Sequence, residues 1–194
     1  ICTTAVFHRC TISADVFAGA SNPNHCTTSN PGKPDSATVG TSATALERLY
    51  QAENRFQDLA DIYLVKAKML DDLEAQKLHL YQAAQIYEEL LNQPLRAVEV
   101  FKQVLELDPE DVNSLDKLIE LFLKLERWEE LLAVYTKRAD IVSSPEEKKA
   151  MYAEMGAVYE RELRDNARAI DTYQRILEVD PDDRAAIARL DALY

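Results

Sequence analysis

Residue types that could bind a metal or form a disulfide gather before residue 41. They are Cys2, His8, Cys10, His25 and Cys26. Their spacing matches no usual zinc pattern, and adjacent His25 and Cys26 rarely reach one metal together, so we predict no metal site. In an exported protein Cys10 and Cys26 are the favoured disulfide pair, whereas in a reducing compartment all three thiols would be free. The cysteine-containing, Ser/Thr/Pro-rich composition of this region favours an exported or extracellular protein over a cytoplasmic one.

Residues beyond position 40 include no set that could carry out catalysis. His79 is the only histidine there, and the residue 72 positions later is Met151, so we interpret His79 as a packed helix residue rather than a base. Acidic pairs such as Glu88–Glu89 and Glu146–Glu147 are typical of solvated helix surface. We therefore expect no enzymatic activity and no cofactor.

The charge of the chain indicates which partners it could bind. Residues 1–45 hold two basic and two acidic side chains, so the whole formal charge of −12 falls on the remaining residues. An acidic surface repels phosphate backbones, which excludes nucleic acid and favours a basic or mixed-charge protein partner. No apolar run approaches the roughly 18 residues of a membrane helix, so we predict no membrane span.

The region before residue 41 differs in composition from the rest, and we place a boundary after residue 40. Residues 19–44 have almost no large apolar side chains and are interpreted as a linker. Residues 5–18 alternate apolar and polar, with Val6, Ile12 and Val16 on one side, as in a half-buried strand. That strand would pair with a second copy or another protein, or the segment is disordered. Because the chain starts with Ile1, we expect a processed end or a piece of a longer product.

From about residue 41 the sequence repeats itself at an offset of 72 residues. Matching pairs include Arg55 and Arg127, Leu59 and Leu131, Tyr63 and Tyr135, Tyr87 and Tyr159, Ala97 and Ala169, Asp108 and Asp180, and Pro109 and Pro181. Each unit divides into two helical hairpins of about 36 residues. Isolated hairpins cannot bury both sides of their helices, so neighbouring hairpins must stack to complete a core.

The hairpin from Ser144 to Asp180 shows the pattern best. Ser144 is the predicted helix-capping residue, Pro145 opens the first turn and Glu147 is the expected capping-box partner. The first helix has an apolar stripe at spacings of three and four, and the second helix has a facing one. The residues of the two stripes are Met151, Met155, Val158, Tyr159 and Leu163, then Ala169, Ile170, Tyr173, Ile176 and Leu177.

These hairpins resemble the tetratricopeptide repeat, a 34-residue helical hairpin with small and aromatic residues at set places and a proline opening the next unit. The places are filled in the Ser144–Asp180 hairpin by Tyr152, Met155, Gly156, Tyr159, Ala169, Tyr173, Ile176 and Pro181. The first hairpin departs from the pattern, with Glu47 where a small residue is usual. The resemblance implies an all-α fold, a right-handed α-solenoid that follows a non-helical extension at residues 1–40. The repeat domain would span residues 41–194, with hairpins at about 41–72, 73–108, 109–143 and 144–180 and an unpaired helix at 182–194.

The resemblance also implies a function, because the first helices of such hairpins line a groove that receives peptides or helices. The corresponding positions are Leu78, Tyr81, Gln85, Glu88 and Glu89, then Asn113, Asp116, Glu120, Leu123 and Lys124, then Ala150, Ala153, Ala157, Glu160 and Arg161. This groove would be acidic with small residues on its floor. Relatives that grip the carboxylate end of chaperones have basic and amide residues where Tyr81, Asp116 and Ala153 stand, so we do not expect that activity. A solvated face without a partner is the competing interpretation.

We therefore predict a non-enzymatic scaffold or adaptor that binds a protein or peptide in this groove. The alternative is a self-assembling structural subunit, a filament or oligomer, whose partner is another copy of itself. It would be joined through Val6, Ile12 and Val16 of the strand and through an uncapped last helix that carries Ile187, Leu190 and Tyr194.

Overall fold

The computed structural model describes the backbone of residues 36–194 and the side chains from residue 43 on. The predicted strand at residues 5–18, with Val6, Ile12 and Val16, lies outside the described residues, and so do Cys10 and Cys26. Within the described part every regular element is helical, which confirms the all-α helical-repeat fold.

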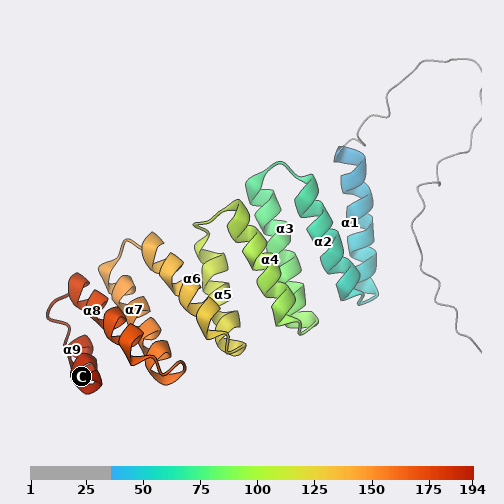
Figure 1. Ribbon diagram of the computed structural model, residues 1–194. Coiled ribbons are helices and arrows are strands. Elements are labelled where there is room, and N and C mark those ends of the chain that lie inside the picture. The colour runs from blue at the N-terminus through green and yellow to red at the C-terminus, as the bar shows by residue number, and fades with distance from the viewer. Residues whose placement is uncertain (1–35) are drawn as a thin grey trace, which may run out of the picture. The chain divides into compact units, whose positions relative to one another are not determined.

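The helices follow one another as antiparallel neighbours, each packed against the next (Figure 1). They are α1 (Ser36–Ala52), α2 (Phe56–Met69), α3 (Leu73–Gln85), α4 (Pro94–Leu107), α5 (Val112–Lys124), α6 (Trp128–Ile141), α7 (Pro145–Arg161), α8 (Asn166–Val179) and α9 (Arg184–Leu193). A π-helical turn, η1 (Ile86–Leu90), continues α3 without a break. The odd-numbered helices α1 to α7 are the first helices of four hairpins, and α9 follows as a single helix.

The first helix begins earlier than the sequence suggested. Helix α1 starts at Ser36, inside the segment interpreted as an extension and linker. Residues 36–44 lack large apolar side chains, but they also contain no proline, and alanine, serine, threonine and valine are all compatible with a helix. A shortage of apolar residues therefore marked the linker's end too late.

The 72-residue repeat is visible in the backbone of the turns. Four residues other than glycine have a positive φ, Asn54 and Glu126 at 55° and 54°, and Asn92 and Arg164 at 50° and 52°. Each pair is 72 residues apart and lies at the turn inside a hairpin. At the first pair the following amide bonds back to the carbonyl five residues earlier, from Arg55 to Tyr50 and from Arg127 to Phe122, which is the Schellman end of a helix.

The inter-helix packing of the first hairpin, where Glu47 replaces a small residue, depends on polar contacts. The Glu47 carboxylate accepts hydrogen bonds from the Tyr63 hydroxyl and the Lys66 ammonium of α2. These bonds lower the pKa of Glu47 against the opposing effect of its burial, and burial together with Glu47 raises the pKa of Tyr63 to about 12. A carboxylate is therefore accommodated between α1 and α2 because α2 supplies both a hydroxyl and a cation.

Helix α7 begins where the sequence predicts, with one difference in its cap. Ser144 Oγ accepts from the Glu147 amide at 3.4 Å, as expected. The Ser144 hydroxyl itself donates to Glu146 at 3.0 Å, and the Glu147 carboxylate lies 3.8 Å from Arg138 of the preceding hairpin. The expected capping-box role of Glu147 is therefore wrong, because a cation across the hairpin junction attracts its side chain.

Candidate functional site

The predicted groove positions lie on α3, η1, α5 and α7, the first helices of three successive hairpins. We call the side of α3, η1, α5, α7 and α9 that carries them the first-helix face. Tyr81, Glu88 and Glu160 are partly buried there. The exposed predicted positions are Gln85, Glu89, Asn113, Asp116, Glu120, Lys124 and Arg161.

Ion pairs join successive first helices across this face. Lys124 Nζ lies 2.8 Å from Glu88 Oε1, which connects α5 to η1, and Arg189 of α9 lies 3.4 Å from Glu160 of α7. Within α5, Lys117 is 2.9 Å from Glu120; the pair raises the pKa of Lys117 and lowers that of Glu120. Carboxylates that the sequence suggested would make the face plainly acidic are thus largely matched by cations.

Two of these cations were not among the predicted site residues. Lys117 and Arg189 stand 72 residues apart, as do Glu88 and Glu160, so the recurrence of a cation at this phase was the signal available in the sequence. A further predicted residue, Asp116, accepts from Arg138 of α6 at 3.0 Å and so links the two helices of its own hairpin.

Tyr81 is the most enclosed of the predicted positions on α3. Its hydroxyl donates to the Asp111 carboxylate and lies 3.0 Å from Ser114 Oγ, and its ring centroid is 5.9 Å from that of Phe101. Burial and the hydrogen bond to Asp111 raise the pKa of Tyr81 to about 12. Asp111 also lies 3.2 Å from Lys77, and the hydrogen bonds from Tyr81 and Ser114 lower its pKa although its burial opposes this. Tyr81 therefore fills the junction between α3 and α5 instead of standing free for a partner.

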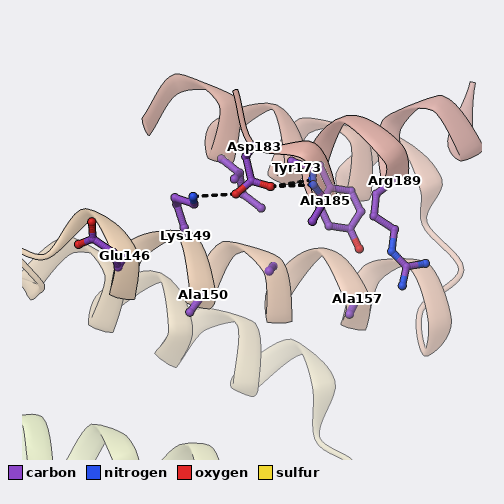
Figure 2. Close-up of a pocket in the computed structure, with 11 residues that line it drawn as sticks. Glu146, Lys149, Ala150, Ala157, Tyr173, Asp183, Ala185 and Arg189 are labelled. Atoms are coloured by element: carbon purple, nitrogen blue, oxygen red, sulfur yellow. Dashed lines mark hydrogen bonds and ion pairs between the residues drawn. The ribbon is translucent and has the colours of Figure 1, made fainter. Parts of the chain in front are cut away.

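The corresponding junction between α7 and α9 is open. A hollow of about 440 Å³ lies there, which we call the α7–α9 hollow. Figure 2 shows Ala150 and Ala157 of α7 on one side and Asp183, Ala185 and Arg189 on the other, with the ring of Tyr173 between the two helices. The full lining is Glu146, Lys149, Ala150, Ala153, Ala157, Tyr173, Ile176, Asp183, Ala185, Ala186 and Arg189. The three alanines of α7 are the small floor positions expected from the sequence.

The walls of the hollow are held by polar contacts at both ends. Lys149 Nζ lies 2.7 Å from Asp183 Oδ2, and Asp183 Oδ1 caps α9 by accepting from the amides of Ala185 and Ala186. At the other end the Tyr173 hydroxyl donates to Glu160 at 3.1 Å. These bonds fix the aromatic floor and the carboxylate of the hollow in place before any ligand arrives.

The residues predicted to mediate self-assembly on α9 differ in their accessibility. Leu190 is 8% exposed and packs beside Ala186, so its side chain is used inside the last junction. Ile187 is 41% exposed and Tyr194 is 83% exposed. Of the predicted apolar end surface, two side chains thus reach solvent.

The described residues also bear on catalysis and on membranes. His79 stacks on Tyr63 with ring centroids 5.7 Å apart and bonds to Gln82 at 2.9 Å, in keeping with a packed helix residue. Among residues 36–194 no group of three metal-ligating side chains converges. In the same part of the chain, none of the helices combines the length and apolarity needed to cross a bilayer.

Comparison with known proteins places these hairpins in a family. A search of curated proteins found no match. Among solved structures the chain is similar to the MamA protein, with 16% identity over 81% of this chain and 82% of that one and a TM-score of 0.46. It is also similar to a putative kinesin light chain of Podosopora anserina with nearly identical TPR-like repeats, with 17% identity, 79% and 84% coverage and a TM-score of 0.48. A third is YrrB, a TPR protein with an unusual peptide-binding site, with 14% identity, 79% and 75% coverage and a TM-score of 0.44.

Family models match one segment in each 72-residue unit. Residues 80–111 match one tetratricopeptide-repeat model, and residues 151–185 match another. The first segment contains most of α3, η1 and all of α4, and the second contains most of α7 and all of α8. With the stacked hairpins on either side of these segments, the chain belongs to the tetratricopeptide-repeat family.

Proposed function

We propose that this protein is a non-enzymatic scaffold that binds a peptide segment of another protein along the first-helix face. The observation that carries the proposal is the α7–α9 hollow. Its α7 wall is built from Ala150, Ala153 and Ala157, positions at which the family resemblance predicts contact with a ligand. Its size falls within the range of about 300–1,000 Å³ that is usual for ligand sites.

The arrangement of the helices supports binding of an extended ligand. Successive first helices are tied to one another through Lys124 and Glu88 and through Arg189 and Glu160. Side chains from different hairpins are therefore held at fixed separations, and a rigid face binds a flexible peptide without an ordering cost of its own.

The charge of the face indicates the partner's chemistry. Glu89, Asn113 and Glu120 are exposed, and the described domain carries an excess of acid. Lys117 and Lys124 neutralise part of this excess locally. A peptide of basic or mixed charge complements such a face and an acidic one does not.

The test is selection of peptides from a random display library on the immobilised full chain, followed by affinity measurement on two charge-reversed variants. Glu89→Lys with Glu120→Lys changes the first-helix face, and Glu99→Lys with Glu106→Lys makes the same change of charge on exposed positions of α4. We expect the first variant to weaken binding of basic peptides at least tenfold and the second to leave it within about twofold. Equal losses in both variants, or no selected peptide at all, would reject the proposal.

Self-assembly is a second candidate, favoured by the exposure of Ile187 and Tyr194 on α9. Its other predicted contact, the amino-terminal strand, lies outside the described residues. Light scattering after size-exclusion chromatography would give the molar mass of the full chain over a range of concentrations. A mass that rises with concentration in the wild type but not in Ile187→Glu would support self-assembly, and a constant monomer mass would reject it.

A further inference from the structure

The two 72-residue units have the same ion pair at the junction between their hairpins. In the first unit Lys77 Nζ lies 3.2 Å from Asp111 Oδ1, and in the second Lys149 Nζ lies 2.7 Å from Asp183 Oδ2. Lys149 and Asp183 follow Lys77 and Asp111 by 72 residues each. The side chains around the two pairs can therefore be compared position by position.

A tyrosine fills the space beside this ion pair in the first unit only. There the Tyr81 ring packs against Phe101, and its hydroxyl contacts Asp111 and Ser114. The counterparts in the second unit are Ala153 for Tyr81, Tyr173 for Phe101, Asp183 for Asp111 and Ala186 for Ser114. The second unit thus keeps the aromatic floor and the carboxylate acceptor but lacks the phenol that uses them.

Neighbouring positions widen the same space. Leu78 and Gln85 of α3, which flank Tyr81, are replaced by Ala150 and Ala157 on α7. These substitutions coincide with the α7–α9 hollow, which is lined by all three of the α7 alanines. The chain itself therefore shows which side chain fits a junction of this kind.

We propose that the α7–α9 hollow is a socket for a tyrosine side chain of the bound peptide, which takes the place that Tyr81 occupies in the first unit. This inference rests on the proposed function and names the side chain that the face recognises. The guest ring would pack on Tyr173 and its hydroxyl would donate to Asp183. Asp183 already accepts from Lys149 and two backbone amides, and Asp111 accepts a phenol in addition to the same kinds of partner, so a lone pair remains for the guest.

The charges around the hollow select for the neutral phenol. Glu146 lines the hollow, and Asp183 would receive the hydroxyl, so a phosphorylated tyrosine would meet two carboxylates. A phenylalanine would fit the walls but leave the Asp183 carboxylate without its donor. Tyrosine is therefore expected to bind more tightly than either.

The socket can be tested without knowing the partner, with 4-methylphenol as the probe for the tyrosine side chain. Alanine methyl signals of the full-length protein would be followed by NMR as the probe is added to about 10 mM, since so small a ligand dissociates in the millimolar range. We expect shifts at Ala153, Ala157 and Ala186, and about three- to tenfold weaker binding of toluene, which lacks the hydroxyl. No shift at these methyls, or equal binding of toluene, would overturn the proposal.

A filled socket provides the variant and its control. Ala153→Tyr places the first unit's residue in the hollow and should abolish the methyl shifts of Ala157 and Ala186, whereas Ala133→Tyr, at an exposed position of α6, should leave them unchanged. Ala150→Leu, which restores the counterpart of Leu78, is a second filling variant if Ala153→Tyr fails to fold. Retention of the shifts in a folded filling variant would show that the probe binds elsewhere.

Peptides selected from the display library separate this inference from the proposed function. A recurrent tyrosine, with binding at least tenfold weaker to Ala153→Tyr than to Ala133→Tyr, would support the socket. Selected peptides that lack a recurrent tyrosine, or that bind Ala153→Tyr unchanged, would overturn the socket while peptide binding stands. If no peptide is selected, the proposed function fails and the 4-methylphenol titration decides the socket alone.

Discussion

Tyr81 should contribute to stability through its hydroxyl and its ring separately, and two substitutions distinguish these contributions. Tyr81→Phe removes the bonds to Asp111 and to Ser114, the latter at 3.0 Å. A hydrogen bond to a charged group is worth about 1.5–3 kcal/mol and one to a neutral group about 1 kcal/mol. Because Asp111 keeps the Ser114 amide at 2.9 Å and Lys77 at 3.2 Å, we expect a net loss of about 2 kcal/mol in the free energy of unfolding.

Tyr81→Ala removes the ring as well. Truncation of a fully buried aromatic residue to alanine costs about 3–5 kcal/mol, and the half-buried ring of Tyr81 should contribute about half of this, or roughly 2 kcal/mol. The total expected for Tyr81→Ala is therefore about 4 kcal/mol.

The measurement is urea unfolding of the full chain, followed by far-UV circular dichroism and by the fluorescence of Trp128, the single tryptophan. Coincident transitions would justify a two-state free energy. Tyr194→Phe is the control, because that residue is 83% exposed and its hydroxyl bonds only weakly placed Gln174 at 3.2 Å; it should change stability by less than about 0.5 kcal/mol. If Tyr81→Phe matches this control, the hydroxyl network does not stabilise the junction. If Tyr81→Ala costs no more than Tyr81→Phe, the ring fills no space and the comparison between units is wrong.

Three further outcomes follow from the backbone, the tyrosines and the packing. Glu126→Gly, at a φ of 54°, should raise the unfolding free energy by about 0.5–1 kcal/mol in urea titrations, because glycine adopts this conformation without the Cβ clash and the gain exceeds its entropy cost. The pKa values of Tyr63 and Tyr81 are raised to about 12, so the stability that their protonated forms contribute is present below about pH 10 and lost between pH 10 and 12. The double Phe variant should lose less stability over that window. Gly156→Ala should destabilise by about 1–3 kcal/mol, because the new Cβ would lie 2.6 Å from the buried Tyr173 ring.

Each of these predictions has a matched control. Lys137→Gly, at an exposed position inside α6, should lower stability by about 1 kcal/mol, opposite in sign to Glu126→Gly. An identical pH profile in the wild type and the double Phe variant would contradict the role assigned to the two tyrosines. Val158→Ala on α7 also changes a buried residue but creates no overlap, so crystallographic displacement of Tyr173 in Gly156→Ala alone identifies the steric cause.

The sequence predicted the hairpins because helix packing repeats apolar residues at a fixed offset. Tyr63 and Tyr135, for example, are both buried in their second helices, and the same phase recovered every junction. The start of α1 was missed because its first turns are built from Ala, Ser and Thr, which fit a helix and a linker alike.

Contacts between hairpins were harder to predict than the hairpins themselves. The links from Lys117 and Arg189 to glutamates depend on how far long side chains reach between helices, which an offset does not reveal. The alanines at 150, 153 and 157 indicated a small floor, but whether neighbouring side chains would close over it required coordinates.

The junction of the first unit provides a reciprocal argument about the second. If Asp111, Phe101 and Lys77 hold Tyr81 as a socket holds a guest, Tyr81→Ala should open a second hollow that 4-methylphenol can enter. Binding there would restore part of the stability lost, by mass action on the folded state, and would raise the urea midpoint of Tyr81→Ala more than that of the wild type. Toluene would restore less, since it cannot donate to Asp111. Rescue of Tyr81→Ala without any binding at Ala153 would show that the walls of the first unit suffice for recognition and that those of the second have diverged to another use.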